Sequence, residues 1–431
     1  MKDTNTEKNN RKQPAGAEPR KKAAAAEPDR QSPVLTRLYG PNDGTPDSPF
    51  YNFVFLAGGL LRGGSPRVTV KDELLKEASV PYIMLVNHAS FFDFLYVNKL
   101  HHPRRPSYLI NEYHSTRPVL RFFKKRIGMI SKKQFYSDLA APMGIFRTLK
   151  KGYPVVIFPE GRTCTDGRSY PIVEEGAAFY KKLDVDLVIA RVRGAYFAAP
   201  KWRGRRYHRG AAVTVEVMKV LKKDAMKAMS DDELNAEIEK NLRENASLDI
   251  QCRYRQHGKA RGLENVLYRC PECGSVYTIK SRGNSLYCTS CGFTRTLNED
   301  YHFTEEPYMI SDWYDRIVEM ERKELPGLHE TIDVKAVIHG AKGGPTRKEM
   351  GVCTLTEEAL SYHSDSIDFS VSMDNIPCFA YSAGTEIDFY YKNELYYFYP
   401  VEHPQDPARW ALFADLLYEK RKNEEQPHIA P

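Results

Sequence analysis

The sequence of 431 residues lacks any apolar run of about 20 residues, the length that a helix needs to cross a bilayer. The uncharged run SPFYNFVFLAGGLL covers only residues 48–61. We expect it either to dock in a membrane interface, with Tyr51, Phe53 and Phe55 as anchors, or to pack against the domain behind it. The start of the chain, MKDTNTEKNN, lacks the apolar core of a signal peptide. We therefore expect a cytoplasmic protein with no signal peptide and no spanning helix.

A large excess of either charge is also missing, since 63 Lys and Arg stand against 56 Asp and Glu, a net charge of +7. This mild bias suits anionic partners such as phosphates, acidic lipid surfaces or nucleic acid, and it does not choose among them. Residues 1–35 are charged, rich in Pro and Ala, and nearly free of large apolar side chains. They predict a disordered tail, with a weak electrostatic tether to acidic lipid as the alternative.

Cysteine is scarce, with eight residues in the chain, and in a reducing compartment these are thiols or metal ligands more often than disulfides. Four of them form two Cys-x-x-Cys pairs, CPECG at 270–274 and CTSCG at 288–292. This spacing is typical of a four-thiolate zinc ribbon, which we place at 251–300. The predicted ligands of one structural zinc are Cys270, Cys273, Cys288 and Cys291, with a rubredoxin-like iron site as the alternative.

Between residues 81 and 221 short apolar runs alternate with a helical pattern, which predicts an α/β layer domain over 36–250. The predicted strands are PYIMLV (81–86), PVVIF (154–158), DLVIARV (186–192) and AAVTVEV (211–217).

Two helices are expected in this domain. The first is predicted over 137–152, with Ser137 as its N-cap, and its shared apolar face is predicted to hold Leu139, Met143, Phe146 and Leu149. The second is predicted from a capping box that starts at Ser230, and its apolar positions are Leu234, Ile238 and Leu242.

Polar residues follow two of the predicted strands. The stretch VNHASFFDF (86–94) places Asn87, His88 and Asp93 directly after the first strand, and FPEGRTCTDG (158–167) follows the second. The carboxyl ends of strands are where open α/β sheets bind ligands. A His with an Asp five positions on is expected about once by chance in a chain of this composition. The two strand ends together therefore carry more weight than the pair alone.

These two blocks, NHASFFD and FPEGR, resemble the glycerolipid acyltransferase family, the group that includes the lysophosphatidic acid (1-acylglycerol-3-phosphate) acyltransferases. The resemblance covers about residues 50–250. It implies that His88 is the general base and that Asp93 orients it. The implied substrate-binding residues are Asn87, Ser90, Glu160, Gly161 and Arg162, together with Lys132, which stands near where a further family block carries Arg.

The resemblance implies transfer of a fatty acyl group from acyl-CoA or acyl carrier protein to the hydroxyl of a lysophospholipid, most simply lysophosphatidic acid to phosphatidic acid. It also implies a peripheral enzyme on the inner face of the membrane. The residue types support such chemistry, because a histidine with a pKa near neutrality can remove the hydroxyl proton while an aspartate holds its other ring nitrogen. The basic and aromatic run RFFKKRIG (121–128) predicts either an ordinary helix with a solvated basic face or a surface that meets anionic lipid.

Residues 301–431 predict a mostly β module capped by a C-terminal helix. A helix is expected over 311–325, followed by alternating aromatic runs with a hairpin at Asn393, and a last helix over 406–422 with Asp406 as N-cap. By shape alone this resembles a pleckstrin-homology-like module. The expected architecture is thus an α/β acyltransferase domain, a small zinc ribbon and this β-rich module.

The rival hypothesis is a zinc-ribbon binding protein, for nucleic acid or for a protein partner, with a vestigial acyltransferase domain. Its candidate nucleic-acid contacts are Lys280, Arg282, Arg295, Tyr277 and Tyr287. The mild charge bias and the complete catalytic blocks count against it, so nucleic acid is not the partner we expect.

Overall fold

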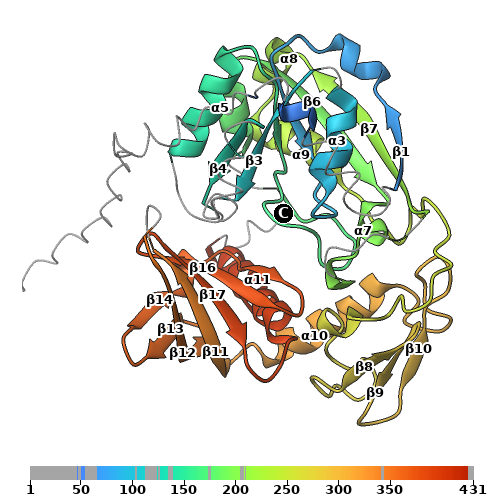
Figure 1. Cartoon of the computed structure of the whole chain (residues 1–431), viewed down its shortest axis with the longest axis vertical. Helices are drawn as coiled ribbons and strands as arrows, with labels where there is room; N and C mark the ends of the chain where they lie inside the picture. Colours follow the sequence, from blue (N-terminus) through green and yellow to red (C-terminus); the bar gives the residue numbers. More distant parts are fainter. Residues whose placement is uncertain are drawn as a thin grey trace, which may run out of the picture.

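The structure is a computed structural model of the whole chain, and it describes residues 46, 50–53, 66–101, 104–111, 124, 127–133, 139–172, 176–203, 208, 210–340 and 344–425. The tail at 1–35 and most of the runs 48–61 and 121–128 lie outside these residues. Three sheets are described, two of seven strands and one of three (Figure 1).

The first sheet is mixed. Its strand order is β1 (Arg67–Lys71), β7 (Ala212–Leu221), β6 (Asp186–Arg193), β2 (Tyr82–Val86), β5 (Val155–Ile157), β3 (Ser107–Asn111) and β4 (Met129–Lys132). The strands from β6 to β4 run parallel to one another, whereas β7 is antiparallel to β6 and β1 is parallel to β7. The four predicted strands are confirmed within a few residues, and β1, β3 and β4 were not predicted.

Strand β2 shows why this sheet is covered on both faces. All five of its residues are buried, as is usual for a strand inside a parallel sheet. Ile83 and Leu85 point into a core with α5 (Ala140–Lys150), α6 (Gly176–Lys182) and α9 (Asp231–Leu242). Met84 and Val86 point into a second core with α3 (Asp93–His101) and α7 (Ala195–Ala198).

The two predicted helices have different outcomes. Helix α9 begins with the predicted capping box of Ser230 and Glu233, and its three apolar positions are buried. Of the four apolar residues predicted to share one face of α5, Leu149 is buried, whereas Leu139, Met143 and Phe146 are 68%, 48% and 49% exposed. The buried face of α5 consists of Ala141, Gly144, Ile145, Thr148 and Leu149. Ser137 lies outside the described residues, and the N-cap of α5 is Leu139, not Ser137 as predicted.

Two small elements follow. The three-stranded sheet has the order β10 (Thr294–Thr296), β9 (Ser285–Cys288) and β8 (Ile279–Arg282). Helix α10 (Ile310–Glu324) packs against it through Trp313, whose indole N–H donates to the carbonyl of Arg269 at 2.9 Å. The Trp313 ring also contacts Phe293 edge to face.

The C-terminal module, residues 329–425, is a seven-stranded antiparallel sheet and one helix. The strand order is β14 (Asp368–Ser372), β13 (Ala359–Ser364), β12 (Thr346–Thr356), β11 (His329–His339), β17 (Glu394–Pro400), β16 (Glu386–Tyr391) and β15 (Ala380–Ser382). Lys392 and Asn393 form the predicted hairpin turn, both with positive φ. Helix α11 (Asp406–Glu425) closes the module. The pleckstrin-homology-like name stays a prediction.

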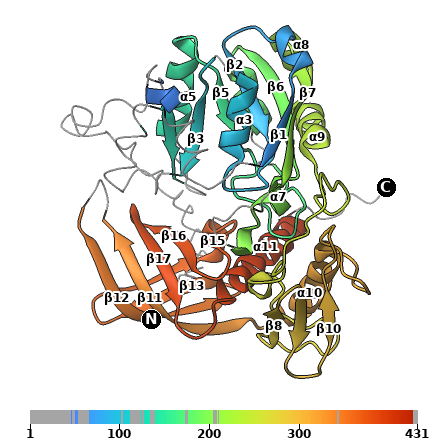
Figure 2. The ribbon, with the colours of Figure 1, turned by 45° about the vertical axis from the view of Figure 1, so that its right-hand side comes forward.

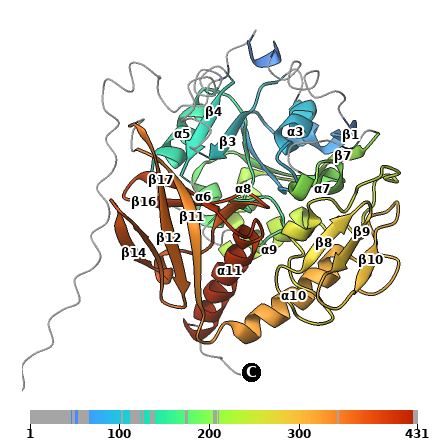
Figure 3. The ribbon, with the colours of Figure 1, turned by 60° about the horizontal axis from the view of Figure 1, so that its bottom comes forward.

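Helix α11 and strands β15 to β17 lie beyond the carboxyl ends of the parallel strands of the mixed sheet, while the ribbon and α10 lie beside them (Figures 1, 2 and 3). One hydrophobic cluster extends from β2 through the three-stranded sheet and α10 into α11. Among the described residues no helix combines the length and the hydropathy that a bilayer crossing requires.

Candidate active site

His88 and Asp93 meet where β2 ends and α3 begins. Asp93 is the first residue of α3, and its Oδ2 lies 2.9 Å from Nδ1 of His88. The same oxygen accepts the backbone N–H of Ser90 at 2.8 Å. The Asp93 side chain is fully buried, whereas the His88 side chain is 22% exposed. Because Nδ1 faces Asp93, the other ring nitrogen, Nε2, is the one that can exchange a proton with a substrate.

The environment of Asp93 decides how it acts on His88. Burial raises the pKa of Asp93 above its ordinary value, and the hydrogen bond and charge of His88 oppose that rise, as does the N–H of Ser90. A buried carboxylate with these two partners is stabilised as the anion by an imidazolium beside it. The pair is therefore suited to a histidine that gains a proton during a reaction.

The loop that follows β5 is joined to His88 by three contacts. The ring of Phe158 stacks on the His88 ring with centroids 4.5 Å apart. The backbone N–H of His88 donates to Oε1 of Glu160 at 2.9 Å, and the N–H of Cys164 donates to the carbonyl of His88 at 2.9 Å. Gly161 has a φ of +71°, a conformation that lets this tight loop turn. The two sequence blocks are thus brought together in space.

Glu160 has both carboxylate oxygens occupied by backbone groups. Oε2 accepts the N–H of Tyr170 at 2.9 Å, in addition to the bond from His88. Burial raises the pKa of Glu160 to about 7, against the lowering effect of these two N–H groups. Through these two hydrogen bonds Glu160 links the backbone of His88 to the backbone of Tyr170. Its role as a substrate contact stays a prediction.

Asn87 makes a similar internal connection. Its side-chain N–H₂ donates to the carbonyl of Val192 at 3.0 Å and to Oε2 of Glu244 at 2.7 Å, and its oxygen accepts the N–H of Val192 at 2.7 Å. Burial raises the pKa of Glu244 to about 8, and the charge of Asp93 adds to the rise. Sequence reasoning missed Glu244, because it follows α9 and nothing in its neighbourhood marks it as a partner of a residue 157 positions earlier.

The remaining predicted contacts are spread over the same edge of the sheet. Ser90 is buried, and its hydroxyl accepts the N–H of Phe92 at 3.2 Å. Lys132 is the last residue of β4, three strands away from β2 in the sheet order. With neighbouring strands about 4.8 Å apart, Lys132 stands roughly 14 Å from the end of β2. The structure therefore groups Asn87, Ser90 and Glu160 around His88 and leaves Lys132 at the far side.

Arg162 makes its main contact with the C-terminal module. Its Nη2 donates to Oδ2 of Asp415 on α11 at 2.7 Å, and its guanidinium lies 3.8 Å above the ring of Tyr170. The side chains of Arg162 and Asp415 are 12% and 21% exposed. Neighbouring residues of the same loop also touch the module, since Thr165 bonds the hydroxyl of Tyr381 at 2.5 Å.

The four cysteines of the ribbon converge. Their sulfur atoms all lie within 4.8 Å of one another, with Cys270 to Cys291 at 3.7 Å and Cys273 to Cys288 at 3.8 Å. A tetrahedral zinc with bonds of about 2.3 Å needs sulfur–sulfur edges of about 3.8 Å. The four residues therefore fit a closed tetrahedral metal site, close enough to bind one ion.

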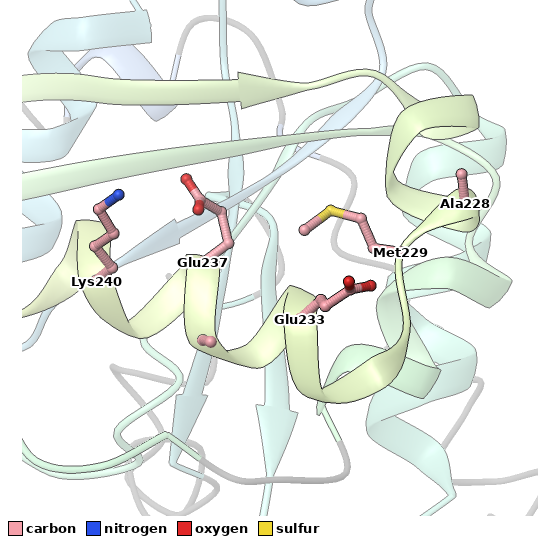
Figure 4. Close-up of a pocket in the computed structure, with 6 residues that line it drawn as sticks. Ala228, Met229, Glu233, Glu237 and Lys240 are labelled. Carbon is pink, nitrogen blue, oxygen red and sulfur yellow. The ribbon is translucent and has the colours of Figure 1, made fainter.

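A surface pocket and the candidate nucleic-acid contact Tyr277 do not belong to the candidate active site. A surface pocket beside α9 and α8 (Lys223–Ala228) is lined by Ala228, Met229, Glu233, Ala236, Glu237 and Lys240, none of which belongs to the candidate site (Figure 4). Tyr277, a proposed base-stacking residue, stacks on His403 instead, and its hydroxyl donates to Asp406 at 2.6 Å. Its ring is thus committed inside the protein, which weakens the nucleic-acid hypothesis.

The residues expected to anchor the N-terminal region in a membrane interface differ in their burial. Tyr51 is buried and its hydroxyl donates to the side chain of Asn98 on α3 at 2.5 Å, so this residue packs against the domain. Phe53 is 61% exposed, and Phe55 lies outside the described residues.

Comparison with known proteins bears on the region that holds the candidate pair. A crystal structure of the 1-acyl-sn-glycerophosphate acyltransferase from Thermotoga maritima aligns with 48% of this chain and 76% of that chain, at 18% sequence identity and a TM-score of 0.36. These values are too low to carry an argument about substrate. A family described as Acyltransferase matches residues 67–189. The segment that contains both the His88–Asp93 pair and the Glu160–Arg162 loop is therefore similar to the Acyltransferase family.

Proposed function

We propose that this protein is a glycerolipid O-acyltransferase that moves a fatty acyl group from acyl-CoA or acyl carrier protein to the hydroxyl of a lysophospholipid. Lysophosphatidic acid, which would become phosphatidic acid, is the proposed acceptor. The observation that carries the proposal is the hydrogen bond between His88 and the buried Asp93, at the carboxyl end of a parallel strand inside the segment that matches the Acyltransferase family.

In the proposed reaction His88 acts as general base. Its Nε2 takes the proton of the acceptor hydroxyl as the oxygen attacks the thioester carbon, and the thiolate of the donor leaves when the tetrahedral intermediate collapses. Asp93 holds Nδ1 and stabilises the imidazolium that forms. The proton then passes from His88 to the departing sulfur, so the enzyme returns to its starting state without an acyl-enzyme.

The surrounding residues take supporting roles. Glu160 holds the backbone N–H of His88, and Asn87 anchors the preceding position to Val192. Arg162 presents a planar fork suited to the acceptor phosphate. Lys132 adds positive charge farther along the same edge. Gly161 allows a ligand to approach the loop backbone.

We also propose that the four ribbon cysteines hold one structural zinc, and that the protein is cytoplasmic and peripheral at the inner face of a membrane. The cysteine geometry supports the first point. The exposed apolar side chains of Leu139, Met143 and Phe146 support the contact with a membrane, because exposed Arg147 and Lys150 lie close to them on α5 and suit anionic lipid.

The test is acylation of a panel of lysophospholipids and glycerol phosphates with both thioester donors, with products identified by mass. The variant His88→Ala should lose about 10²–10⁴ in rate, because the general base is removed. Unchanged product formation by this variant would contradict the mechanism.

The chain offers a matched control in His363. It stands five residues before Asp368, as His88 does before Asp93, and its Nδ1 lies 3.6 Å from an Asp368 oxygen. Both of these side chains are exposed, at 75% and 82%. The variant His363→Ala should therefore acylate at the wild-type rate, which separates the buried pair from a chance one.

A further inference from the structure

The C-terminal module closes the edge of the sheet on which the candidate site lies. Its contacts with that edge come from several loops: Lys133 after β4 bonds the side chain of Asn393 at 2.8 Å, and Tyr390 bonds Asn111 at the end of β3 at 3.4 Å. Lys201 lies 3.6 Å above the ring of Tyr381. The module thus covers the side of the molecule from which an acceptor would approach Arg162.

At the centre of this interface, only one of the two terminal nitrogens of Arg162 has a hydrogen-bond partner among the described residues. Asp415 accepts from Nη2, while the buried Nη1 has no hydrogen-bond partner among the residues that the structure describes. A guanidinium binds a phosphate through two parallel N–H bonds, so a phosphate at this position would satisfy both nitrogens. A buried donor without a partner costs about 1–3 kcal/mol. Asp415 is therefore an incomplete partner for Arg162.

Asp415 is the carboxylate that contacts Arg162 directly, and two further ionisable groups lie near the pair. The second cation is Lys201, and the second carboxyl is Asp388 on β16. Burial and the nearby Arg162 lower the pKa of Lys201 to about 7, so its positive charge is partial at neutral pH. Burial likewise raises the pKa of Asp388 well above its ordinary value, so Asp415, which bonds Arg162 directly, is the carboxylate that neutralises the guanidinium. A phosphate can bond both Nη1 and Nη2 of Arg162 only if it displaces the carboxylate of Asp415 from Nη2.

We infer that Asp415 is a specificity-determining residue that occupies Arg162 in place of the acceptor's anionic group, so that the docked C-terminal module and a phosphate-bearing acceptor compete for the same guanidinium. This inference rests on the proposed function, in which Arg162 takes the acceptor phosphate. Acceptors without a phosphate do not have to break this ion pair. The affinity for lysophosphatidate then reports how easily α11 releases Arg162.

The experiment compares full-length wild type with Asp415→Asn and with the control Asp315→Asn. Asp315, on α10, pairs with Arg168 at 2.6 and 3.0 Å, so the control breaks a contact to the same loop without touching Arg162. For Asp415→Asn the KM for lysophosphatidate should fall about tenfold, a coupling of ordinary size, with kcat little changed. The KM for monoacylglycerol should stay the same in all three proteins.

An unchanged or raised KM for lysophosphatidate in Asp415→Asn would overturn the inference, because Asp415 would then be neutral or help to build the site. An equal fall in both variants would also overturn it, since general loosening of the interface would explain the effect. Absence of any His88-dependent product would instead count against the proposed function.

A second measurement uses wild-type protein and needs no turnover. Hydrogen exchange is followed in β15 and α11 with lysophosphatidate or with monoacylglycerol added. Exchange of these segments should become faster with lysophosphatidate alone, because only the phosphate displaces Asp415. Equal exchange with the two lipids would overturn the inference even if Asp415→Asn failed to fold.

Discussion

At the scale of single residues, the neighbourhood of His88 depends on buried carboxyl groups as much as on the catalytic pair. The sequence pointed to His88 and Asp93 because they are polar residues at the end of an apolar strand. It could not point to Glu244 or Asp415, because their contacts with Asn87 and Arg162 join positions 157 and 253 residues apart. Such pairs depend on how the chain folds back and leave no local pattern.

Glu244 gives a pH-dependent prediction. Its pKa is about 8 in the folded protein against an ordinary value of 4.5, so between these pH values the folded state keeps a proton that the unfolded state has lost. The contribution of Glu244 to the free energy of unfolding therefore falls as pH rises from about 4.5 to about 8. Glu244→Gln keeps an acceptor for Asn87 and removes this titration.

We expect the melting temperature of Glu244→Gln to exceed that of wild type by an amount that grows between pH 5 and pH 8. The gain should reach a few degrees, since about 1 kcal/mol shifts the melting temperature of a domain of this size by roughly 2–4 °C. Melting curves at a series of pH values test this. Parallel pH profiles for the two proteins would refute it.

At the scale of elements, strands and helices with strong patterns were predictable and their inner faces less so. The aromatic runs of β16 and β17 and the capping box of α9 were confirmed. Helix α5 carries two apolar stripes, and the larger side chains, including Met143 and Phe146, face outward. The sequence could not decide between the stripes, because both hold apolar residues and only the packing of the folded chain shows that Ile145 and Leu149 are buried.

The ribbon gives a prediction at this scale. The purified protein should contain one zinc per chain, and Cys288→Ser, which removes a buried ligand, should lose it together with the fold of β8 to β10. Elemental analysis measures the metal. The emission of Trp313 should change as well, because its indole bonds the carbonyl of the residue before Cys270.

Stoichiometric iron with visible absorption would replace the zinc interpretation by the rubredoxin-like one. A protein that kept its zinc and its Trp313 emission in Cys288→Ser would show that these four cysteines are not a joint site.

At the scale of the whole molecule, a buried ion network ties the ribbon to the C-terminal module. Glu321 on α10 is fully buried between Arg269 and Arg409, with contacts of 3.2 and 3.3 Å. Arg409, on α11, also pairs with Glu330 of β11 at 2.9 Å. These residues come from separate sequence regions, so the arrangement of the parts could not be read from the sequence, although each part could.

Glu321→Ala should destabilise the protein by about 3–5 kcal/mol, because two buried guanidinium groups lose the fully buried carboxylate between them and keep only the partly exposed Glu324 and Glu330. The control is Glu419→Ala, which breaks the pair with Arg322 at 2.8 Å between side chains that are 55% and 51% exposed. That change should cost about 0–1 kcal/mol. Denaturant titration of both variants measures the contrast, and equal losses would show that burial of the network contributes nothing.

The ion pair between Arg162 and Asp415 has a consequence for the order of events during synthesis. The two residues are 253 positions apart, so Arg162 leaves the ribosome long before its partner is made. At roughly 5–20 residues per second, the delay is about 10–50 s. During this interval the nascent chain presents the Arg162 loop with no C-terminal module above it, so the site is closed only after α11 has been made.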